Sequence, residues 1–247
     1  MRYAMVVEYD GTNYAGWQRQ KNAVSVQQKI EEALEIVLGV KTIIYASGRT
    51  DSGVHAEGQV AHFECEKELN TRRITYSINS LLPSDIKLQN IFSVAPDFHA
   101  QYSAKRKTYV YRSYVNECPS PLKDRFYARI LPPVDVEKMK RASKALVGKH
   151  DFKAFCSTGS SIQTTVREIY EFNIIERDDE IMFEITGNGF LYNMVRIIVG
   201  TLYFIGKGKL PETAIEEMLS TGIRKLGGKT YPACGLCLKK VEYIDAD

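Results

Sequence analysis

The chain has 247 residues, of which 44% are hydrophobic and 26% charged, as is typical of a globular protein that can bury its own core. It contains no run of 18 apolar residues, so we expect no membrane span, and residues 1–3 lead into a strand pattern without a signal peptide, so we expect a cytoplasmic protein. Five scattered cysteines argue against a disulfide framework, and Cys234 and Cys237 lack the second pair that a zinc ribbon needs.

The net charge of +3 is unevenly distributed along the chain. Residues 1–104 carry 10 Lys and Arg against 12 Asp and Glu, whereas residues 105–247 carry 23 against 18. The second part opens with three successive cations, Lys105, Arg106 and Lys107. Such a distribution suits a polyanion such as RNA that binds along one side of the molecule, although solvated helix faces explain part of it equally well.

Apolar periodicity predicts one order of elements twice, namely strand, helix, strand, strand, helix, strand. In the first part, Ser25 and Gly39 are typical N-cap and C-cap residues of a helix. The first part is expected to contain strands at 3–8, 42–46, 59–65 and 86–94 and helices at 25–39 and 71–82. The second part is expected to contain strands at 107–115, 166–176, 181–186 and 236–244 and helices at 135–148, 190–205 and 211–219.

This doubled order is that of the split βαβ, or ferredoxin-like, unit, in which helices cover one face of an antiparallel sheet. We therefore expect an α+β fold in which two such units form an extended antiparallel sheet with helices on one face and a cleft between the units. The predicted domains are an N-terminal domain at 1–104 and a more basic C-terminal domain at 105–247. A stretch rich in Ser, Thr and Gly at 155–165 predicts a loop, which we expect to be mobile.

A polar loop with the sequence GRTDSGVH occupies residues 48–55, between two strand patterns. Its glycines allow a sharp turn and the close approach of a ligand, which would leave Arg49 and Asp51 displayed. The loop is therefore a candidate active site, although a solvated surface turn fits the same composition. We find no phosphate-binding glycine loop, dinucleotide fingerprint or metal-ligand cluster, so we expect a site without metal or cofactor.

Several residues of the chain suit an RNA base as ligand. An enzyme that acts on a base takes it out of the stack, and the long planar side chain of Arg49 could fill the vacated space. Tyr109, Tyr111 and Tyr114 follow the three cations, which joins stacking surface to phosphate attraction. Tyrosines at this spacing on a strand also commonly pack against one another, so this pattern leaves both interpretations open.

Arg196 lies in a strongly apolar helical pattern, where a cation without a partner would be costly to bury. It is therefore expected to have an anionic partner. Asp51 is one candidate, and such a pair would keep the carboxylate ionised. Another acidic residue, or a side chain that reaches solvent at the helix edge, would serve equally well.

Over nearly its whole length the chain resembles the tRNA pseudouridine synthase A family. The signature at residues 48–56 is the most specific point of resemblance, and Tyr109 follows the basic cluster as in the family. The other matching motifs are YAGWQ at 14–18, NGF at 188–190, MVR at 194–196, VG at 199–200 and PACGL at 232–236.

The resemblance implies a role for each of five residues. Asp51 would be the nucleophilic carboxylate, and Arg49 would insert into the RNA where the uridine leaves. Tyr109 would stack on the target base, Arg196 would pair with Asp51, and Leu236 would pack beneath the base. The Cys234–Cys237 spacing is a local departure that touches none of these residues.

The resemblance also implies the reaction, isomerisation of uridine to pseudouridine at positions 38, 39 and 40 of the tRNA anticodon stem-loop by base flipping. It implies a homodimer that needs no cofactor and holds tRNA in a basic cleft, to which we assign Lys105, Arg106 and Lys107. One carboxylate suffices for this chemistry, whereas a glycosidase needs two acids across the bond. Attack at ribose C1′, addition at C6 and a glycal route stay open, and Tyr109 is our candidate for the base that removes the C5 proton.

Two other classes of function fit parts of the sequence. A non-catalytic RNA-binding or chaperone module would use the cations and tyrosines but would have no use for Asp51. A base-excising hydrolase would use Asp51 but leave an abasic site instead of an isomer of unchanged mass.

Overall fold

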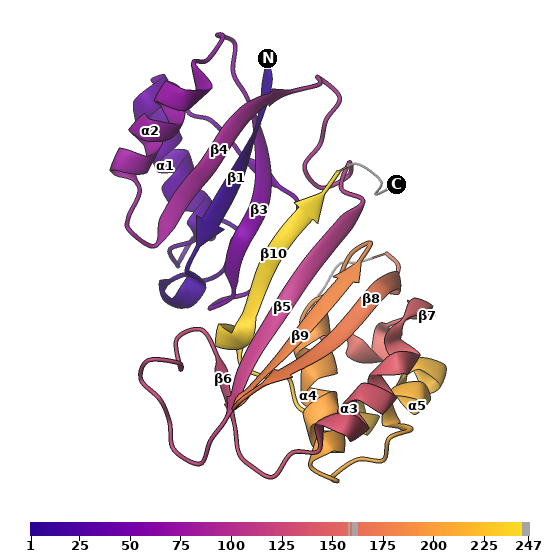
Figure 1. The fold of residues 1–247 in the computed structure, drawn as a ribbon. Helices are drawn as coiled ribbons and strands as arrows, with labels where there is room; N and C mark the ends of the chain where they lie inside the picture. The colour runs from indigo at the N-terminus through magenta and orange to yellow at the C-terminus, as the bar shows by residue number, and fades with distance from the viewer. Residues whose placement is uncertain (158, 160–162, 244–247) are drawn as a thin grey trace. The chain divides into compact units, whose positions relative to one another are not determined.

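The computed structural model describes residues 1–157, 159 and 163–243, and its fold is drawn in Figure 1. Contacts divide the chain into two compact units, which we describe separately. Unit 1 comprises Met1–Lys105 together with the chain from Cys237 onward, and unit 2 comprises Arg106–Leu236. The division into domains at 1–104 and 105–247 stays a prediction, and the contacts group the last strand with unit 1. Part of the loop expected at 155–165 and the end of the last expected strand lie outside the described residues.

Unit 1 has the split βαβ order that the sequence predicts, with mixed α and β elements. Its sheet has the order β4-β1-β3-β2, in which each neighbouring pair is antiparallel, and the final strand β10 lies parallel to β3. Figure 1 shows both helices on one side of this sheet. The elements are β1 (Arg2–Tyr9), η1 (Gly11–Asn13), α1 (Val26–Leu38), β2 (Tyr45–Ala46), β3 (His55–Glu64), α2 (Thr71–Leu81), β4 (Ile86–Val94) and β10 (Leu236–Glu242).

Helix α1 has the caps that its sequence predicts. The Ser25 side chain accepts a hydrogen bond from the Gln28 amide, and Gly39 ends the helix in the left-handed conformation at φ 74°. Strand β2 is shorter than the expected 42–46. The reason is that the Ile44 amide donates to the Glu31 carboxylate of α1 instead of to a neighbouring strand.

Unit 2 repeats the pattern around a sheet of order β5-β9-β8-β7, again antiparallel, with the short β6 parallel to β5. The hairpin of β8 and β9 forms where the sequence predicts it, with Asp178 left-handed in the turn at φ 52°. The strands are β5 (Arg106–Val115), β6 (Ala128–Ile130), β7 (Gly148–Asp151), β8 (Val166–Arg177) and β9 (Glu180–Gly187). The helices are α3 (Val136–Ser143), η2 (Lys144–Leu146), η3 (Lys153–Phe155), α4 (Met194–Gly206), α5 (Ala214–Thr221), η4 (Arg224–Leu226) and η5 (Ala233–Gly235).

Two of the expected helices of unit 2 are too long at one end, and the third, expected at 211–219, lies at Ala214–Thr221. The helix expected at 135–148 ends at Ser143, because a 3₁₀ turn follows and Gly148, at φ 109°, opens strand β7. The helix expected at 190–205 begins only at Met194, because Asn193 has a left-handed φ of 62° that no α-helix accommodates. Apolar periodicity did not predict strands β6 and β7 because each has at most four residues. Within the described part of the chain, no helix has the length and apolar character needed to cross a membrane.

Candidate active-site residues

The loop at 48–55, in unit 1, is held by direct backbone contact with the loop before α1. The Trp17 amide donates to the Thr50 carbonyl over 3.1 Å, and the Gly53 amide donates to the Tyr14 carbonyl over 3.3 Å. A Cβ at Gly16, which has φ 85°, would lie 2.4 Å from the Thr50 carbonyl oxygen. Only glycine allows so close an approach of two main chains. The motif at 14–18 therefore serves to fix the loop that carries Asp51.

Buried polar contacts hold both ends of this loop and leave its centre accessible. Thr50 is buried and its hydroxyl lies 2.8 Å from the Tyr9 hydroxyl, so a side-chain hydrogen bond to β1 fixes the residue before Asp51. The Val54 amide donates to the Asp51 carbonyl over 3.1 Å and closes a turn. Asp51 itself is half-buried and Arg49 is exposed. The loop thus displays a cation and a carboxylate on a fixed backbone.

His55 is a polar anchor of this loop that the sequence analysis did not single out. It is buried, and its Nδ1 accepts a hydrogen bond from the Gly11 amide over 3.1 Å. The Asp10 carboxylate lies 3.1 Å from the same nitrogen. A Cβ at Gly11 would lie 2.0 Å from the Val54 carbonyl oxygen, so this contact also requires glycine. The available signal was a histidine at the end of the polar loop, where the next strand pattern begins.

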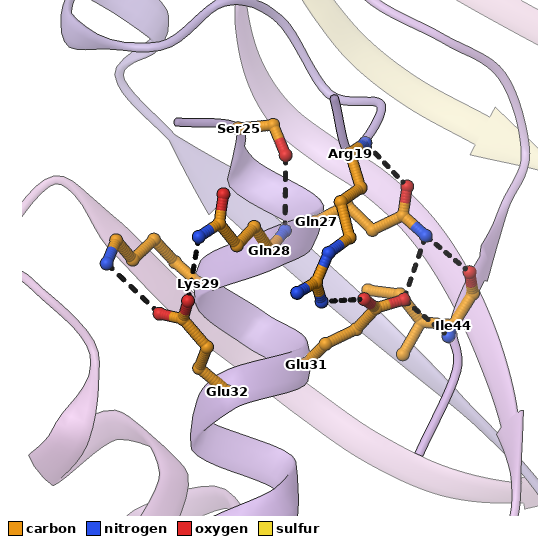
Figure 2. A network of polar contacts seen from close by, with 8 residues as sticks. All are labelled: Arg19, Ser25, Gln27, Gln28, Lys29, Glu31, Glu32 and Ile44. Carbon is orange, nitrogen blue, oxygen red and sulfur yellow. Dashed lines mark hydrogen bonds and ion pairs between the residues drawn. The ribbon is translucent and has the colours of Figure 1, made fainter. Parts of the chain in front are cut away.

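A second network ties helix α1 to the segments before and after that helix, at Arg19 and at Ile44, as Figure 2 shows. The buried Glu31 carboxylate accepts hydrogen bonds from Arg19 over 2.9 Å and from Gln27 over 2.9 Å. Gln27 also donates to the Ile44 carbonyl over 3.2 Å. A buried carboxylate is tolerated when its oxygens are satisfied in this way. The network is structural support for the loop.

Tyr109 is the only one of the three predicted stacking tyrosines that reaches the surface at all. It lies on β5, is 9% exposed, and its ring packs edge-on against Phe190 at 5.1 Å. Tyr111 and Tyr114 are fully buried, and their hydroxyls bond to the Pro232 carbonyl and the Asp124 carboxylate. Of the two interpretations that the sequence left open, packing holds for Tyr111 and Tyr114, which belong to the core of unit 2.

Arg196 lies on the first turn of α4 and contacts two neutral oxygens within unit 2. Its Nε donates to the Tyr231 carbonyl over 2.7 Å, and its Nη1 donates to the Asn193 side-chain oxygen over 2.7 Å. The guanidinium is therefore oriented by one residue before the helix and one residue from a distant segment. Its pairing with Asp51 stays a prediction.

Glycines bring that distant segment onto α4. A Cβ at Gly200 would lie 1.8 Å from the Lys229 carbonyl oxygen, and a Cβ at Gly228 would lie 2.4 Å from the Gly200 carbonyl oxygen. The two main chains therefore touch, and this contact delivers Tyr231 to Arg196. Leu236, which is buried at the start of β10, follows Gly235, where a Cβ would lie 2.5 Å from the Arg112 carbonyl oxygen.

The three successive cations have different environments. Lys105 is exposed in unit 1, whereas the Arg106 guanidinium lies over the Tyr170 ring at 5.0 Å. Burial, together with the nearby Arg167 cation, lowers the pKa of Lys107 to about 8. Lys107 is thus charged at neutral pH but loses its charge more readily than a surface lysine.

The cysteines and the metal ligands show no further site in the part of the chain that the structure describes. The five cysteines, all of which the structure describes, form no disulfide, and burial raises the pKa of the Cys234 thiol. Within residues 1–157, 159 and 163–243, no three His, Cys, Asp or Glu side chains are grouped as metal ligands.

Comparison with known proteins identifies the family. A family model described as tRNA pseudouridine synthase matches residues 5–103 and 142–244. The chain belongs to the tRNA pseudouridine synthase family. It is 44% identical, over 98% of its length, to the tRNA pseudouridine synthase A of Syntrophotalea carbinolica, and the match covers 96% of that protein. It is 45% identical, over 97% of its length, to the tRNA pseudouridine synthase A of Ruminiclostridium cellulolyticum, and the match covers 98% of that protein.

The solved crystal structure of a Cbf5-Nop10-Gar1 complex is a more distant match. It is 10% identical at a TM-score of 0.42, with 96% of this chain and 48% of that chain covered, a likeness too weak to inform the function. The signature that the sequence analysis took as most specific, at residues 48–56, lies within the first segment of the family match. The expected resemblance to this family is confirmed.

Proposed function

We propose that this member of the tRNA pseudouridine synthase family isomerises uridines 38, 39 and 40 of the tRNA anticodon stem-loop with Asp51 as its nucleophile. Family membership supports the isomerisation of uridine in tRNA. The observation that supports Asp51 is its position, half-buried at the centre of a loop whose backbone is fixed on both sides by Thr50 and Val54. A carboxylate held in this way can attack without first being ordered.

Two other carboxylates near this loop, those of Asp10 and Asp85, accept structural hydrogen bonds. Asp10 accepts from the Thr12 amide over 3.0 Å and caps η1, and Asp85 accepts from the Tyr14 hydroxyl over 2.5 Å. They hold the loop before α1 in place. We assign the chemistry to Asp51 because of its position at the centre of the loop.

The reaction breaks the bond between ribose C1′ and uracil N1, turns the base, and joins C1′ to C5. The proton on C5 is then lost and N1 gains one, so the product has the mass of the substrate. Asp51 would form a transient covalent bond and be released unchanged. Arg49, which is exposed beside it, would occupy the stack that the uridine leaves.

From unit 2 we assign Tyr109 to the target base, Arg196 to the Asp51 carboxylate and Leu236 to the apolar surface beneath the base. The small exposed part of Tyr109 is consistent with contact to a single flat ligand. Tyr109→Phe separates its two suggested roles, because it keeps the ring and removes the hydroxyl. If the hydroxyl removes the C5 proton, this variant should bind tRNA normally and release C5 tritium at least tenfold more slowly.

The decisive experiment measures tritium release from C5-labelled uridine in tRNA and identifies the product by derivatisation specific for pseudouridine. Asp51→Asn and Asp51→Ala should abolish release, while Asp97→Asn, which removes an exposed charge from the same unit, should leave release unchanged. Activity in either Asp51 variant would refute the nucleophile. Abasic sites in the product would point to a base-excising hydrolase, and tRNA binding without any product to a non-catalytic module.

We further propose that the enzyme is a cytoplasmic homodimer that binds tRNA partly through Lys105, Arg106 and Lys107. Sedimentation equilibrium tests the dimer, and a mass of 28.0 kDa at all concentrations would contradict it. Because Lys107 has a pKa of about 8, its share of the electrostatic attraction should weaken as the pH rises from 7 to 9. Lys107→Arg, which stays charged, should remove that part of the pH dependence.

A further inference from the structure

Unit 1 carries a cluster of contacting aromatic side chains that the active-site assignment does not use. It consists of Tyr45, His62, His99 and Tyr102, which we call the aromatic platform. The rings of His99 and Tyr102 lie 4.3 Å apart at an interplanar angle of 31°, and those of Tyr45 and His62 lie 5.2 Å apart at 25°. The two histidine rings meet edge-on, 4.7 Å apart at an interplanar angle of 63°, and join the pairs. Four residues from three separate segments thus form one cluster of contacting rings.

Hydrogen bonds fix the turn that displays the platform. The His99 Nδ1 accepts from the Gln101 amide over 3.2 Å, and the His62 Nδ1 accepts from the Ala100 amide over 3.2 Å. The Tyr243 hydroxyl donates to the Ala100 carbonyl over 2.8 Å. The Ser103 hydroxyl accepts from the His99 amide over 3.0 Å. The turn is therefore ordered before any ligand arrives, so its rings lose little freedom when a ligand binds.

The outer rings of the platform are open to solvent. Tyr102 is 79% exposed and Tyr45 is 51% exposed, although each ring contacts a histidine ring. His62 faces the side of the sheet that carries Ala4, its partner across β1 and β3, and the small apolar cluster on this side contains no residue of α1 or α2. The platform therefore lies on the face of unit 1 that the helices leave uncovered.

The chemistry around the two open rings is that of a nucleic-acid ligand. Gln101 and Lys105, both exposed, lie beside Tyr102 in the sequence and supply an amide and a cation. Flat rings next to a cation bind unpaired bases and their phosphates together. A protein partner would instead need a broad apolar core of several large side chains.

We propose that the aromatic platform is a second RNA contact, on which unpaired bases of the tRNA substrate stack outside the catalytic residues. This inference rests on the proposed function in one respect only, that the substrate is tRNA. The platform would add affinity without taking part in bond making, because none of its residues is assigned to the reacting base. Its removal should therefore raise KM and leave kcat unchanged.

Tyr76 offers a matched control. It is also 79% exposed and belongs to the same unit, but it lies on α2, and its ring has no aromatic partner among the residues that the structure describes. Because the Tyr102 ring is exposed and the turn is held by other groups, Tyr102→Ala should fold normally. Tyr102→Trp should keep the stacking surface.

The experiment measures equilibrium binding of unmodified tRNA to the full-length chain over a range of salt concentrations, together with pseudouridine formation. Tyr102→Ala should weaken binding roughly five- to a hundredfold, Tyr76→Ala should not change it, and Tyr102→Trp should restore it. The salt dependence of Tyr102→Ala should keep the wild-type slope, since no charge is removed, whereas Lys105→Ala should reduce that slope by about one.

Three outcomes would overturn the inference. If Tyr102→Ala binds tRNA as Tyr76→Ala does while the wild-type chain forms pseudouridine, the platform fails and the proposed function stands. If the wild-type chain neither binds tRNA nor forms pseudouridine, both fail. If Tyr102→Ala loses affinity for tRNA and sedimentation shows that its oligomeric state has also changed, the rings bind a second copy of the chain and not RNA.

Discussion

Unit 1 and unit 2 use the same device, glycine at a main-chain contact, to place different kinds of residue. In unit 1, Gly16 lets the loop before α1 touch the loop that carries Asp51, and both partners are irregular segments. In unit 2, Gly200 lets a returning segment touch α4, so that the Tyr231 carbonyl reaches Arg196. The first contact fixes the backbone of the assigned nucleophile, and the second orients a side chain on a regular helix.

The difference teaches where each unit should be sensitive to change. The unit 1 contact lies between loops, so a fault there should displace Asp51 while the sheet and helices persist. The unit 2 contact involves a helix buried along most of its length, so a fault there should reduce the stability of the whole unit. A change at the unit 1 contact is therefore expected to lower mainly activity, and a change at the unit 2 contact mainly folding stability.

The largest effect on stability is expected for Gly200→Ala. Its Cβ would lie 1.8 Å from the Lys229 carbonyl oxygen, and neither main chain can move without disturbing α4. We expect a loss of about 3 kcal/mol or more in the free energy of unfolding, measured by urea denaturation. Gly206→Ala in the same helix is the control, because its Cβ would meet the flexible Met139 side chain and should cost less. Equal losses in the free energy of unfolding would show that the backbone contact at Gly200 contributes no more to stability than the side-chain contact at Gly206.

Gly16→Ala should have the opposite profile. Its Cβ would lie 2.4 Å from the Thr50 carbonyl oxygen, and its φ of 85° also disfavours alanine, so the loop must shift. We expect kcat for pseudouridine formation to fall about a hundredfold, or about 2.7 kcal/mol, because misplacing a reacting group by about 1 Å has a cost of this order. Gly39→Ala has a similar φ of 74° but open space around its Cβ, and should keep full activity.

These contacts also show how far sequence alone could reach. Apolar periodicity and cap residues predicted the doubled split βαβ order, because α1, β4 and the β8–β9 hairpin are set by local patterns. The sequence could not predict that Tyr111 is buried while Tyr109 keeps a small exposed surface. Both side chains lie on the same face of β5, and only the covering segment with Pro232 distinguishes them. The Asn193 and Tyr231 contacts to Arg196 were missed because they depend on a left-handed backbone and a distant chain segment.

Unit 1 should also lose stability in acid because of one buried histidine. Burial, with the nearby cations of His99 and Arg2, lowers the pKa of His62 to about 4. The unfolded chain therefore binds more protons than the folded one between pH 6.5 and 4, so stability is full above pH 6.5 and falls as the pH drops towards 4. By pH 5 the loss should be about 2 kcal/mol.

Fluorescence of Trp17, the single tryptophan, reports this loss because the residue is buried in unit 1. Urea unfolding followed at pH 7 and pH 5 should show the midpoint falling with acidification. His62→Asn keeps an acceptor for the Ala100 amide but does not titrate, so its midpoint should fall less between the two pH values. An equal fall in both proteins would assign the acid sensitivity to other groups.

The smallest effect is expected where the orientation of Arg196 depends on one side-chain bond. Asn193→Gly keeps the left-handed backbone at φ 62° but removes the oxygen that accepts from the Arg196 Nη1, while the Tyr231 carbonyl still holds Nε. We expect kcat to fall about tenfold with KM unchanged, because a single hydrogen bond to a charged group contributes roughly 1.5 kcal/mol. Ser157→Ala removes the other bond of the Asn193 amide and should leave kcat unchanged. If Asn193→Gly turns over at the wild-type rate, the Tyr231 carbonyl alone orients Arg196, and unit 2, like unit 1, depends on main-chain contact to place its charged residue.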